Sequence, residues 1–415
     1  MTKIGFLHSS DAGWLSVPQV SARVSAEASA GVLARLIASR AAVTKVALTS
    51  ETGLARSTVS AGLAALERIG LIKPGGLIDH SGRGRPGQEI IINPEFGTIA
   101  VIEVDTTGSV IGLYDFGQRL LARIESDVTI ADDGADAVGR LATEIFDAID
   151  QCKGADLRIA IMTFPGPVDV SRGVLAAPPY MPGWTGLPLE KLLAERLGCV
   201  AMLRNETDVR ALGEARHLPQ SESPLLYVRV HEGVGSGFTT AEGQLFTGVG
   251  GAAGELGHMR TQIREGAVCV CGEKDHVNCH GAASTMKRKW TLHVQEHPDT
   301  SPADFEEALR LHVPTAVKIA GDAARVLGIA LVDALLLLNP ARVTIGGAVA
   351  EAGDAVLAAV RSTVYELGFP LATRDLTIAG SVLGADAGLL GGVVLALEEY
   401  LSAPQIRELL ARTGR

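Results

Sequence analysis

Apolar positions in the first hundred residues repeat at helical spacing in three segments. These segments are 27–40, about 45–51 and about 56–69, where apolar side chains recur three or four positions apart. Thr44 can cap the second segment, Gly53 supplies a turn, and Gly70 ends the third. Two short strands, Leu71–Ile72 and Glu89–Ile92, follow around a Gly-rich tip. This order of elements predicts a winged helix-turn-helix at 26–95, after an arm at 1–25.

The predicted DNA-reading surface combines the start of the third segment with the tip of the strand pair. Short polar and basic side chains there suit close approach to phosphates and base edges, and an Arg between glycines can enter a minor groove. The alternative is a packing corner followed by a solvated hairpin. The candidate DNA-binding residues are Thr44, Arg56, Ser57, Thr58, Ser60, Arg83 and Arg85.

From residue 98 onward the pattern changes to apolar strands alternating with helices. Residues 98–116 read as two strands joined by a turn, and a helical stretch follows near 132–152. The segment from 224 repeats this strand-turn-strand pattern. Two such halves predict a duplicated α/β domain, which we place at 96–405, with a cleft between two lobes.

Charge separates the two parts of the chain. Residues 1–95 hold ten Lys/Arg and seven Asp/Glu, whereas the rest carries 27 against 40, for a total net charge of −10. A mildly basic head on an acidic body fits a nucleic-acid partner for the head. No secretion signal and no apolar run of eighteen residues is recognisable, so we expect a cytoplasmic protein without a membrane partner.

Three of the five cysteines cluster in "GELGHMRTQIREGAVCVCGEKDHVNCHG". Clustered Cys in a reducing compartment favour a metal or chemistry over disulfides, and Cys-x-Cys with a distant His can hold one zinc ion. Free reduced cysteines are the plain alternative. A redox pair is a weaker one, because catalytic dithiols usually show Cys-x-x-Cys.

The body resembles the ROK family, which contains bacterial sugar-responsive repressors and sugar kinases. The resemblance rests on "PGPVDVSRGVLAAPPYMPGWTGLPL", "RNETDVRALGE", "GAAGELGHM", "CVCG" and "LNPARVTIGG", spread over most of 98–400. It implies a two-lobed, actin-like (ribonuclease H-like, duplicated) fold. The head resembles the winged helix-turn-helix of the family's regulator branch.

The resemblance also implies an effector site and a zinc site. Asn205, Glu206, Glu255 and His258 would contact a sugar or sugar phosphate. His258, Cys269 and Cys271 would bind a structural zinc, with Cys279 preferred as the fourth ligand and His276 as the alternative. Tyr180 stands where the family has a sugar-contacting Asn.

Two departures from the kinase pattern favour a regulator over a kinase. In the family's kinases the first phosphate turn reads Asp-x-Gly-Gly-Thr, whereas here residues 103–107 read Glu-Val-Asp-Thr-Thr, which puts the negative Asp105 where a phosphate would lie. Glu206 replaces the catalytic Asp, and its longer side chain displaces the carboxylate. The sequence therefore predicts no enzyme activity. We expect instead a sugar-responsive repressor of carbohydrate-metabolism genes that binds operator DNA as a homodimer or homotetramer, with an ATP-dependent sugar kinase as the alternative.

Overall fold

The computed structural model describes residues 15–16, 26–78, 87–176 and 180–413. These residues form two compact units. Unit 1 comprises residues up to 162, 188–203 and 392 onward, and unit 2 comprises 163–187 and 204–391. The predicted boundaries at 25/26 and 95/96 remain predictions. No described helix is long and apolar enough to cross a membrane.

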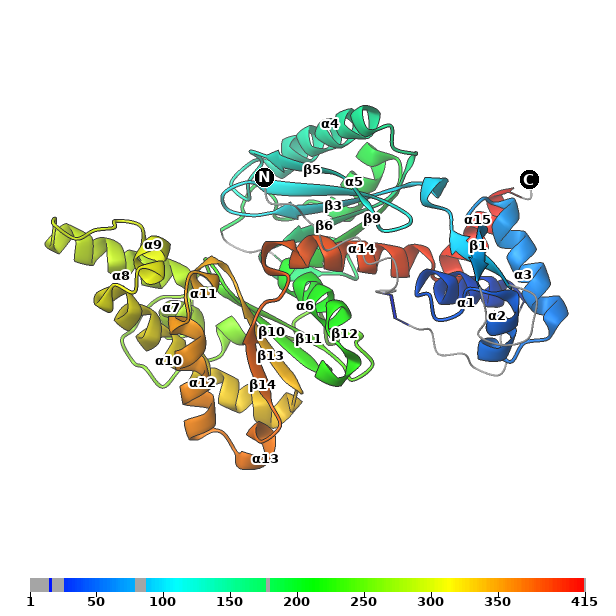
Figure 1. Cartoon of the computed structure of the whole chain (residues 1–415). Coiled ribbons are helices and arrows are strands. Elements are labelled where there is room, and N and C mark those ends of the chain that lie inside the picture. The colour runs from blue at the N-terminus through cyan, green and yellow to red at the C-terminus, as the bar shows by residue number, and fades with distance from the viewer. Residues whose placement is uncertain (1–14, 17–25, 79–86, 177–179, 414–415) are drawn as a thin grey trace. The chain divides into compact units, whose positions relative to one another are not determined.

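The head, in unit 1, has three helices and a strand pair, as the sequence pattern predicts (Figure 1). Leu33, Leu48 and Leu66, one from each helix, are fully buried and form its centre. Gly62 lies so close to α1 that an added Cβ would stand 2.7 Å from Leu33. The elements are α1 (Ala26–Ala38), α2 (Lys45–Thr52), α3 (Arg56–Arg68), β1 (Ile72–Ile78) and β2 (Gly87–Ile92).

A five-stranded sheet lies mainly in unit 1, and its last two strands in sequence each run two residues into unit 2. The sheet order is β5-β4-β3-β6-β9, and β3, β4 and β5 pair antiparallel. All seven side chains of β3 are buried, as expected for a central strand. The elements are β3 (Thr98–Val104), β4 (Ser109–Asp115), β5 (Leu120–Ser126), α4 (Gly134–Cys152), β6 (Leu157–Phe164), α5 (Leu189–Leu197) and β9 (Val200–Asn205).

Unit 2 contains a second five-stranded sheet, in the order β12-β11-β10-β13-β14. Strands β10 and β11 pair antiparallel, while β10, β13 and β14 run parallel. The elements are β7 (Val168–Asp169), β8 (Val174–Leu175), α6 (Glu206–His217), β10 (Leu225–Val230), β11 (Val234–Thr239), β12 (Leu245–Phe246), α7 (Val277–Gly281), α8 (Ala283–Glu296), α9 (Phe305–Arg310), α10 (Pro314–Leu338), β13 (Arg342–Gly346), α11 (Ala348–Glu351), α12 (Ala355–Leu367), α13 (Pro370–Thr373) and β14 (Thr377–Gly380).

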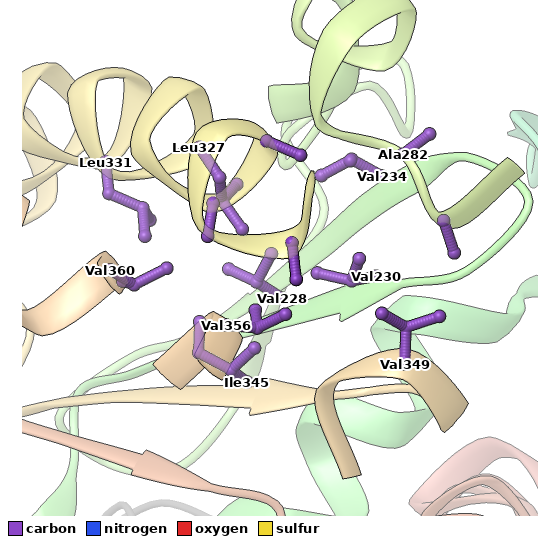
Figure 2. Close-up of a cluster of buried hydrophobic side chains, with 14 of the residues drawn as sticks. Val228, Val230, Val234, Ala282, Leu327, Leu331, Ile345, Val349, Val356 and Val360 are labelled. Atoms are coloured by element: carbon purple, nitrogen blue, oxygen red, sulfur yellow. The ribbon is translucent and has the colours of Figure 1, made fainter. Parts of the chain in front are cut away.

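The core of unit 2 lies between this sheet and the helices α10 and α12. Figure 2 shows Val228 and Val230 of β10 facing Leu327 of α10, with Val356 of α12 beside them. Each of these four side chains is fully buried. The apolar stretch "GIALVDALLLLNP", predicted as a buried helix or strand, is the second half of α10 and the residues after it.

Two C-terminal helices complete the structure. Helix α14 (Ala387–Tyr400) begins in unit 2, where an added Cβ on Gly391 would stand 1.8 Å from the carbonyl oxygen of Val209 in α6. The same helix ends in unit 1. Helix α15 (Ala403–Thr413) then packs on α1 of the head, where an added Cβ on Gly31 would lie 2.8 Å from the Cα of Ala403.

Candidate effector and metal site

Asn205 ends β9 and caps α6. Its Oδ1 accepts hydrogen bonds from the backbone N–H groups of Thr207 (2.7 Å) and Asp208 (3.2 Å), and its Nδ2 donates to the carbonyl of Gly166 (2.9 Å). An Asn at this position satisfies otherwise unpaired N–H groups of the helix. Because both ends of its amide are bonded, Asn205 has a fixed position beside the 165–166 loop.

Glu206, the first residue of α6, is held by two arginines. Its Oε2 lies 3.1 Å from Nε of Arg210 and 2.5 Å from a guanidinium nitrogen of Arg229 on β10. All three residues are 8% exposed. A buried carboxylate needs such partners. Glu206 is therefore an anchor between α6 and β10, and the oxygen shared by two guanidinium groups is not free to take a proton from a substrate hydroxyl.

The loop after β12 presents Glu255 and His258 together. A 3.8 Å contact joins Nε2 of His258 to a carboxylate oxygen of Glu255, and each side chain is about one third exposed. Burial raises the pKa of the Glu255 carboxyl and lowers the pKa of the His258 imidazole, so burial favours the neutral form of both. Gly254 has φ +94°, and an added Cβ there would stand 2.3 Å from the carbonyl oxygen of Ser236, so only Gly fits.

Four His and Cys side chains converge next to this loop. The ligand atoms of His258, Cys269, Cys271 and His276 all lie within 4.8 Å of one another. Nδ1 of His258 is 3.8 Å from Sγ of Cys269, and Nδ1 of His276 is 3.5 Å from Sγ of Cys271. Nitrogen and sulfur ligands of one tetrahedral zinc lie about 3.5 Å apart, from the usual bond lengths. The donor set and its spacing therefore fit zinc.

Cys279, our preferred fourth ligand, is outside this group of four. It is buried, and its thiol donates to the carbonyl oxygen of Ala267 at 3.3 Å. The structure thus favours the alternative, His276, and corrects the preference for matching Cys with Cys. The backbone of His276 forms a β-bridge with Arg260, and its side chain lies against Cys271.

Thiol ionisation would accompany metal binding. Burial raises the pKa of the Cys269 thiol to about 11 without a metal, and burial lowers the pKa of the His276 imidazole. Zinc binds the thiolate and the neutral imidazole. The histidine is thus ready to bind, whereas the thiol would release its proton to the solvent.

The turn after β3 in unit 1, which the sequence analysis compared with a phosphate-binding turn, is closed by its own side chain. Oδ1 of Asp105 accepts from the backbone N–H of Thr106 at 2.7 Å, and the N–H of Asp105 donates to the carbonyl of Gly108 at 3.0 Å. The N–H groups of Asp105 and Thr106 are therefore engaged, and the carboxylate opposes an anion.

The Gly-rich turn 231–237 of unit 2 is closed by Asn278 of α7. The N–H of Val234 donates to Oδ1 of Asn278 at 2.6 Å, and the N–H of His231 donates to the carbonyl of Gly233 at 2.8 Å. Our sequence analysis missed this contact of Asn278. The three glycines gave no hint of it, because the partner is 44 residues away.

Tyr180 is the last of the candidate site residues from the sequence analysis in this unit. It is 37% exposed, and its hydroxyl donates to the carbonyl of Pro165 at 2.8 Å. Burial, followed by the negative charges of Glu255, Glu206 and Cys269, raises the pKa of its phenol to about 12. The Tyr180 hydroxyl is held at the 165–166 loop, whose Gly166 carbonyl also accepts from Asn205.

In the head, the first turn of α3 presents Arg56 and Ser57 as exposed side chains, with Thr58 and Ser60 half-buried. No described side chain caps this helix, so its first N–H groups are available to a phosphate. Thr44 is 7% exposed and its Oγ1 accepts from the N–H of Ala47, which makes it a helix cap with little surface for DNA. Arg83 and Arg85 lie outside the described residues.

The comparisons with known proteins identify the family. A model described as "ROK family" matches residues 122–399, about two thirds of the chain. The chain belongs to the ROK family. The expected α/β fold, with its actin-like ROK sheets, is confirmed.

Relatives in the ROK family include kinases and regulators. Glucokinase of Thermotoga maritima is 26% identical over 318 residues, which cover 72% of this chain and 98% of that protein. Xylose repressor of Bacillus spizizenii is 23% identical over 381 residues, which cover 89% of this chain and 95% of that protein. The repressor thus matches a larger share of this chain than the kinase does.

A solved ROK structure matches nearly the whole chain. It is described as a ROK family transcriptional regulator, homolog of E. coli MLC protein, and has a TM-score of 0.78 at 21% identity. The match covers 93% of this chain and 99% of the solved one. The fold of this chain is accordingly that of a ROK-type regulator.

Proposed function

We propose that this chain is a sugar-responsive, DNA-binding transcriptional regulator, most simply a repressor of carbohydrate-metabolism genes, rather than a sugar kinase. The proposal rests on two turns that resemble phosphate-binding turns and that are closed by side chains of this chain. Asp105 closes one and Asn278 closes the other, so backbone N–H groups that would bind phosphate are already bonded. The anchored Glu206 adds to this, because a kinase needs a free carboxylate as its base.

The head would supply the contacts with DNA. Arg56 and Ser57 at the exposed start of α3 would enter the major groove, and Arg83 and Arg85 of the strand-pair tip would reach the minor groove. A homodimer or homotetramer would place two such helices about one DNA turn apart on a palindromic operator. The ligand can shift DNA affinity only by its difference in affinity for the two arrangements of the protein.

The input site would comprise Asn205, Glu255 and His258, with zinc beside it. Zinc held by His258, Cys269, Cys271 and His276 would fix the loop that carries Glu255. His258 is suited to a double role, because Nδ1 faces the cysteines while Nε2 faces Glu255. Bound zinc would add structural rigidity here and no chemical step.

The test begins with selection of operator sequences from a random duplex library by the full chain. Affinity for the selected duplex is then measured with and without each sugar of a panel. We expect specific binding that one sugar weakens at least about tenfold, a coupling of about 1.4 kcal/mol. A chain that selects no sequence would contradict the proposal.

The glucokinase relatives make the kinase the second candidate. Incubation with labelled ATP and the same panel tests it directly. We expect no sugar phosphate above the background of a heat-treated sample. Turnover at about 1 s⁻¹ or faster, which is ordinary for kinases, would replace the regulator with an enzyme.

A further inference from the structure

Helix α10 has an exposed outer face that the proposed function leaves unused. Its inner face packs against the sheet and against α12 as part of the core of unit 2 (Figure 1). On the opposite side, exposed residues recur three or four positions apart from Asp322 onward, which places them on one face of the helix. They are Asp322, Arg325, Ile329, Asp333 and Leu336, with Leu337 at the edge of the face.

Three side chains of this outer face are apolar and remain in contact with water. Ile329 is 37% exposed, Leu336 56% and Leu337 84%. Contiguous apolar surface on a globular protein commonly marks a contact with another molecule. The apolar surface continues beyond α10, because a 3.7 Å ion pair between Arg325 and Glu366 brings the end of α12 to the same face, and α13 also contacts α10. The exposed apolar residues that follow Glu366 are Leu367, Phe369 and Leu371.

The residues of the outer face are arranged symmetrically around Ile329. Arg325 lies four positions before Ile329, and Asp333 lies four positions after it. The half-buried Val326 and Val332 lie three positions before and three positions after it. A twofold axis through Ile329 and perpendicular to α10 would therefore bring Arg325 of one copy opposite Asp333 of a second copy. The same axis brings Val326 opposite Val332, so the face is complementary to itself when two α10 helices lie antiparallel.

Both charges of this arrangement are available to a second copy. Asp333 is exposed, and no residue that the structure describes forms an ion pair with it. The Arg325 side chain is 55% exposed and pairs with Glu366 through one terminal nitrogen, which leaves N–H groups for a further carboxylate. A face with one base, two acids and several apolar side chains disfavours DNA or a partner of a single charge sign, whereas it matches its own copy.

We propose that the outer face of α10 is a homodimer interface, in which two α10 helices pack antiparallel across a twofold axis at Ile329. Arg325 of each copy pairs with Asp333 of the other. Stable homodimers bury roughly 800 Å² or more per partner, and the exposed side chains of α12 and α13 extend the contact beyond the two helices. The inference deepens the proposed function, which needs two heads on one operator, by naming the contact that joins them.

Charge reversal followed by charge exchange tests this pairing. Sedimentation equilibrium of the full chain without DNA measures the dissociation constant of the dimer. Arg325→Asp and Asp333→Arg should each weaken the dimer at least about tenfold, because each places two like-charged pairs across the axis. The double variant Arg325→Asp/Asp333→Arg restores opposite charges in both pairs, so its dissociation constant should return to within about threefold of the parent. This recovery also excludes misfolding as the cause of the weakening.

Arg288→Asp is the matched control, because Arg288 is exposed on α8 of the same unit and its reversal should leave the dissociation constant unchanged. A monomeric parent would overturn the inference, as would single reversals that do not weaken the dimer or a double variant no tighter than the singles. If the reversals leave a dimer intact that still selects an operator, the interface fails while the regulator stands. If the dimer behaves as expected but selects no duplex, the proposed function fails and the interface stands.

Discussion

At the scale of single residues, motif positions could be predicted from the sequence but their partners could not. Asn205 and Glu206 were identified as one pair, and the structure places them at the start of α6. Asn205 caps the helix, whereas Glu206 forms an ion pair with Arg229, which lies 23 residues later on β10. A charged residue inside the apolar strand "LLYVRV" was the available signal for Arg229. No sequence signal marked Asp208, since its burial depends on tertiary packing.

Asp208 leads to a prediction about pH. Burial, then the charge of Glu255, raises the pKa of its carboxyl from 3.8 to about 8. The folded chain therefore holds this proton more tightly than the unfolded chain between about pH 4 and pH 8, and the contribution of Asp208 to the free energy of unfolding falls as pH rises through that window.

Asp208→Asn removes this titration while keeping the size of the side chain. The Tm difference between variant and parent should move in favour of the variant by about 2 °C or more from pH 6 to pH 8.5, because one pKa unit is worth about 1.4 kcal/mol. Differential scanning calorimetry measures it, and the parent corrects for other titrating groups. A Tm difference that does not change with pH would mean that Asp208 keeps an ordinary pKa.

The metal cluster gives a second prediction at this scale. His276→Ala should lower bound zinc from about one equivalent per chain to well below one, because it removes one of four converging ligands. Cys279→Ser is the matched control and should keep the zinc, since the Cys279 thiol bonds to Ala267. Elemental analysis after dialysis measures both. The opposite pattern would restore Cys279 as the ligand.

At the scale of elements, helix boundaries in the head followed from capping and periodicity. The expected segments 27–40, 45–51 and 56–69 correspond to α1, α2 and α3 within two residues at each end. Thr44 caps α2 and Gly53 ends it with φ +65°, as those residue types favour. The strand pair is longer than predicted. Strand β1 continues through Pro74 and two glycines, which strands disfavour, so a prediction from residue preferences ends too early.

Two substitutions separate the structural and DNA-contacting roles in these helices. Thr44→Ala removes the cap and should lower the free energy of unfolding of the head by about 1 kcal/mol without changing the salt dependence of DNA binding. Arg56→Ala should weaken binding to the selected duplex and reduce the slope of log affinity against log salt by about 1. Fluorescence anisotropy at several salt concentrations measures the slope, and an unchanged slope for Arg56→Ala would remove it from the interface.

At the scale of the whole molecule, two similar sheets were predictable from the repeated strand-turn-strand pattern. The order of their strands and the assignment of the C-terminal helices were not. Nothing in residues 387–413 indicates that α14 belongs to both units, or that α15 packs on the head. Such contacts depend on complementary surfaces far apart in the chain, and a single sequence does not mark them.

The attachment of the head to the end of α14 can be tested with one buried carboxylate. Glu398 is 9% exposed; it accepts from the N–H of Ser16 at 2.6 Å and from its Oγ at 2.7 Å, and it lies 3.4 Å from Arg35 of α1. Glu398→Ala leaves these buried donors without this acceptor, at a cost of about 2–3 kcal/mol. Hydrogen exchange in residues 29–38 should become faster, whereas Glu399→Ala, at the exposed neighbouring position, should leave it unchanged. Equal exchange in both variants would show that α1 is held by other contacts.

The packing of α15 on α1 also has a consequence during synthesis. A ribosome moving at roughly 5–20 residues per second needs tens of seconds to travel from the end of α3 to residue 413. During that time α15 has not yet been synthesised, so it does not cover α1 and the nascent head lacks this contact. A chain that ends before α15 would therefore keep this surface of α1 exposed, and its head would lack a contact that the full-length chain has.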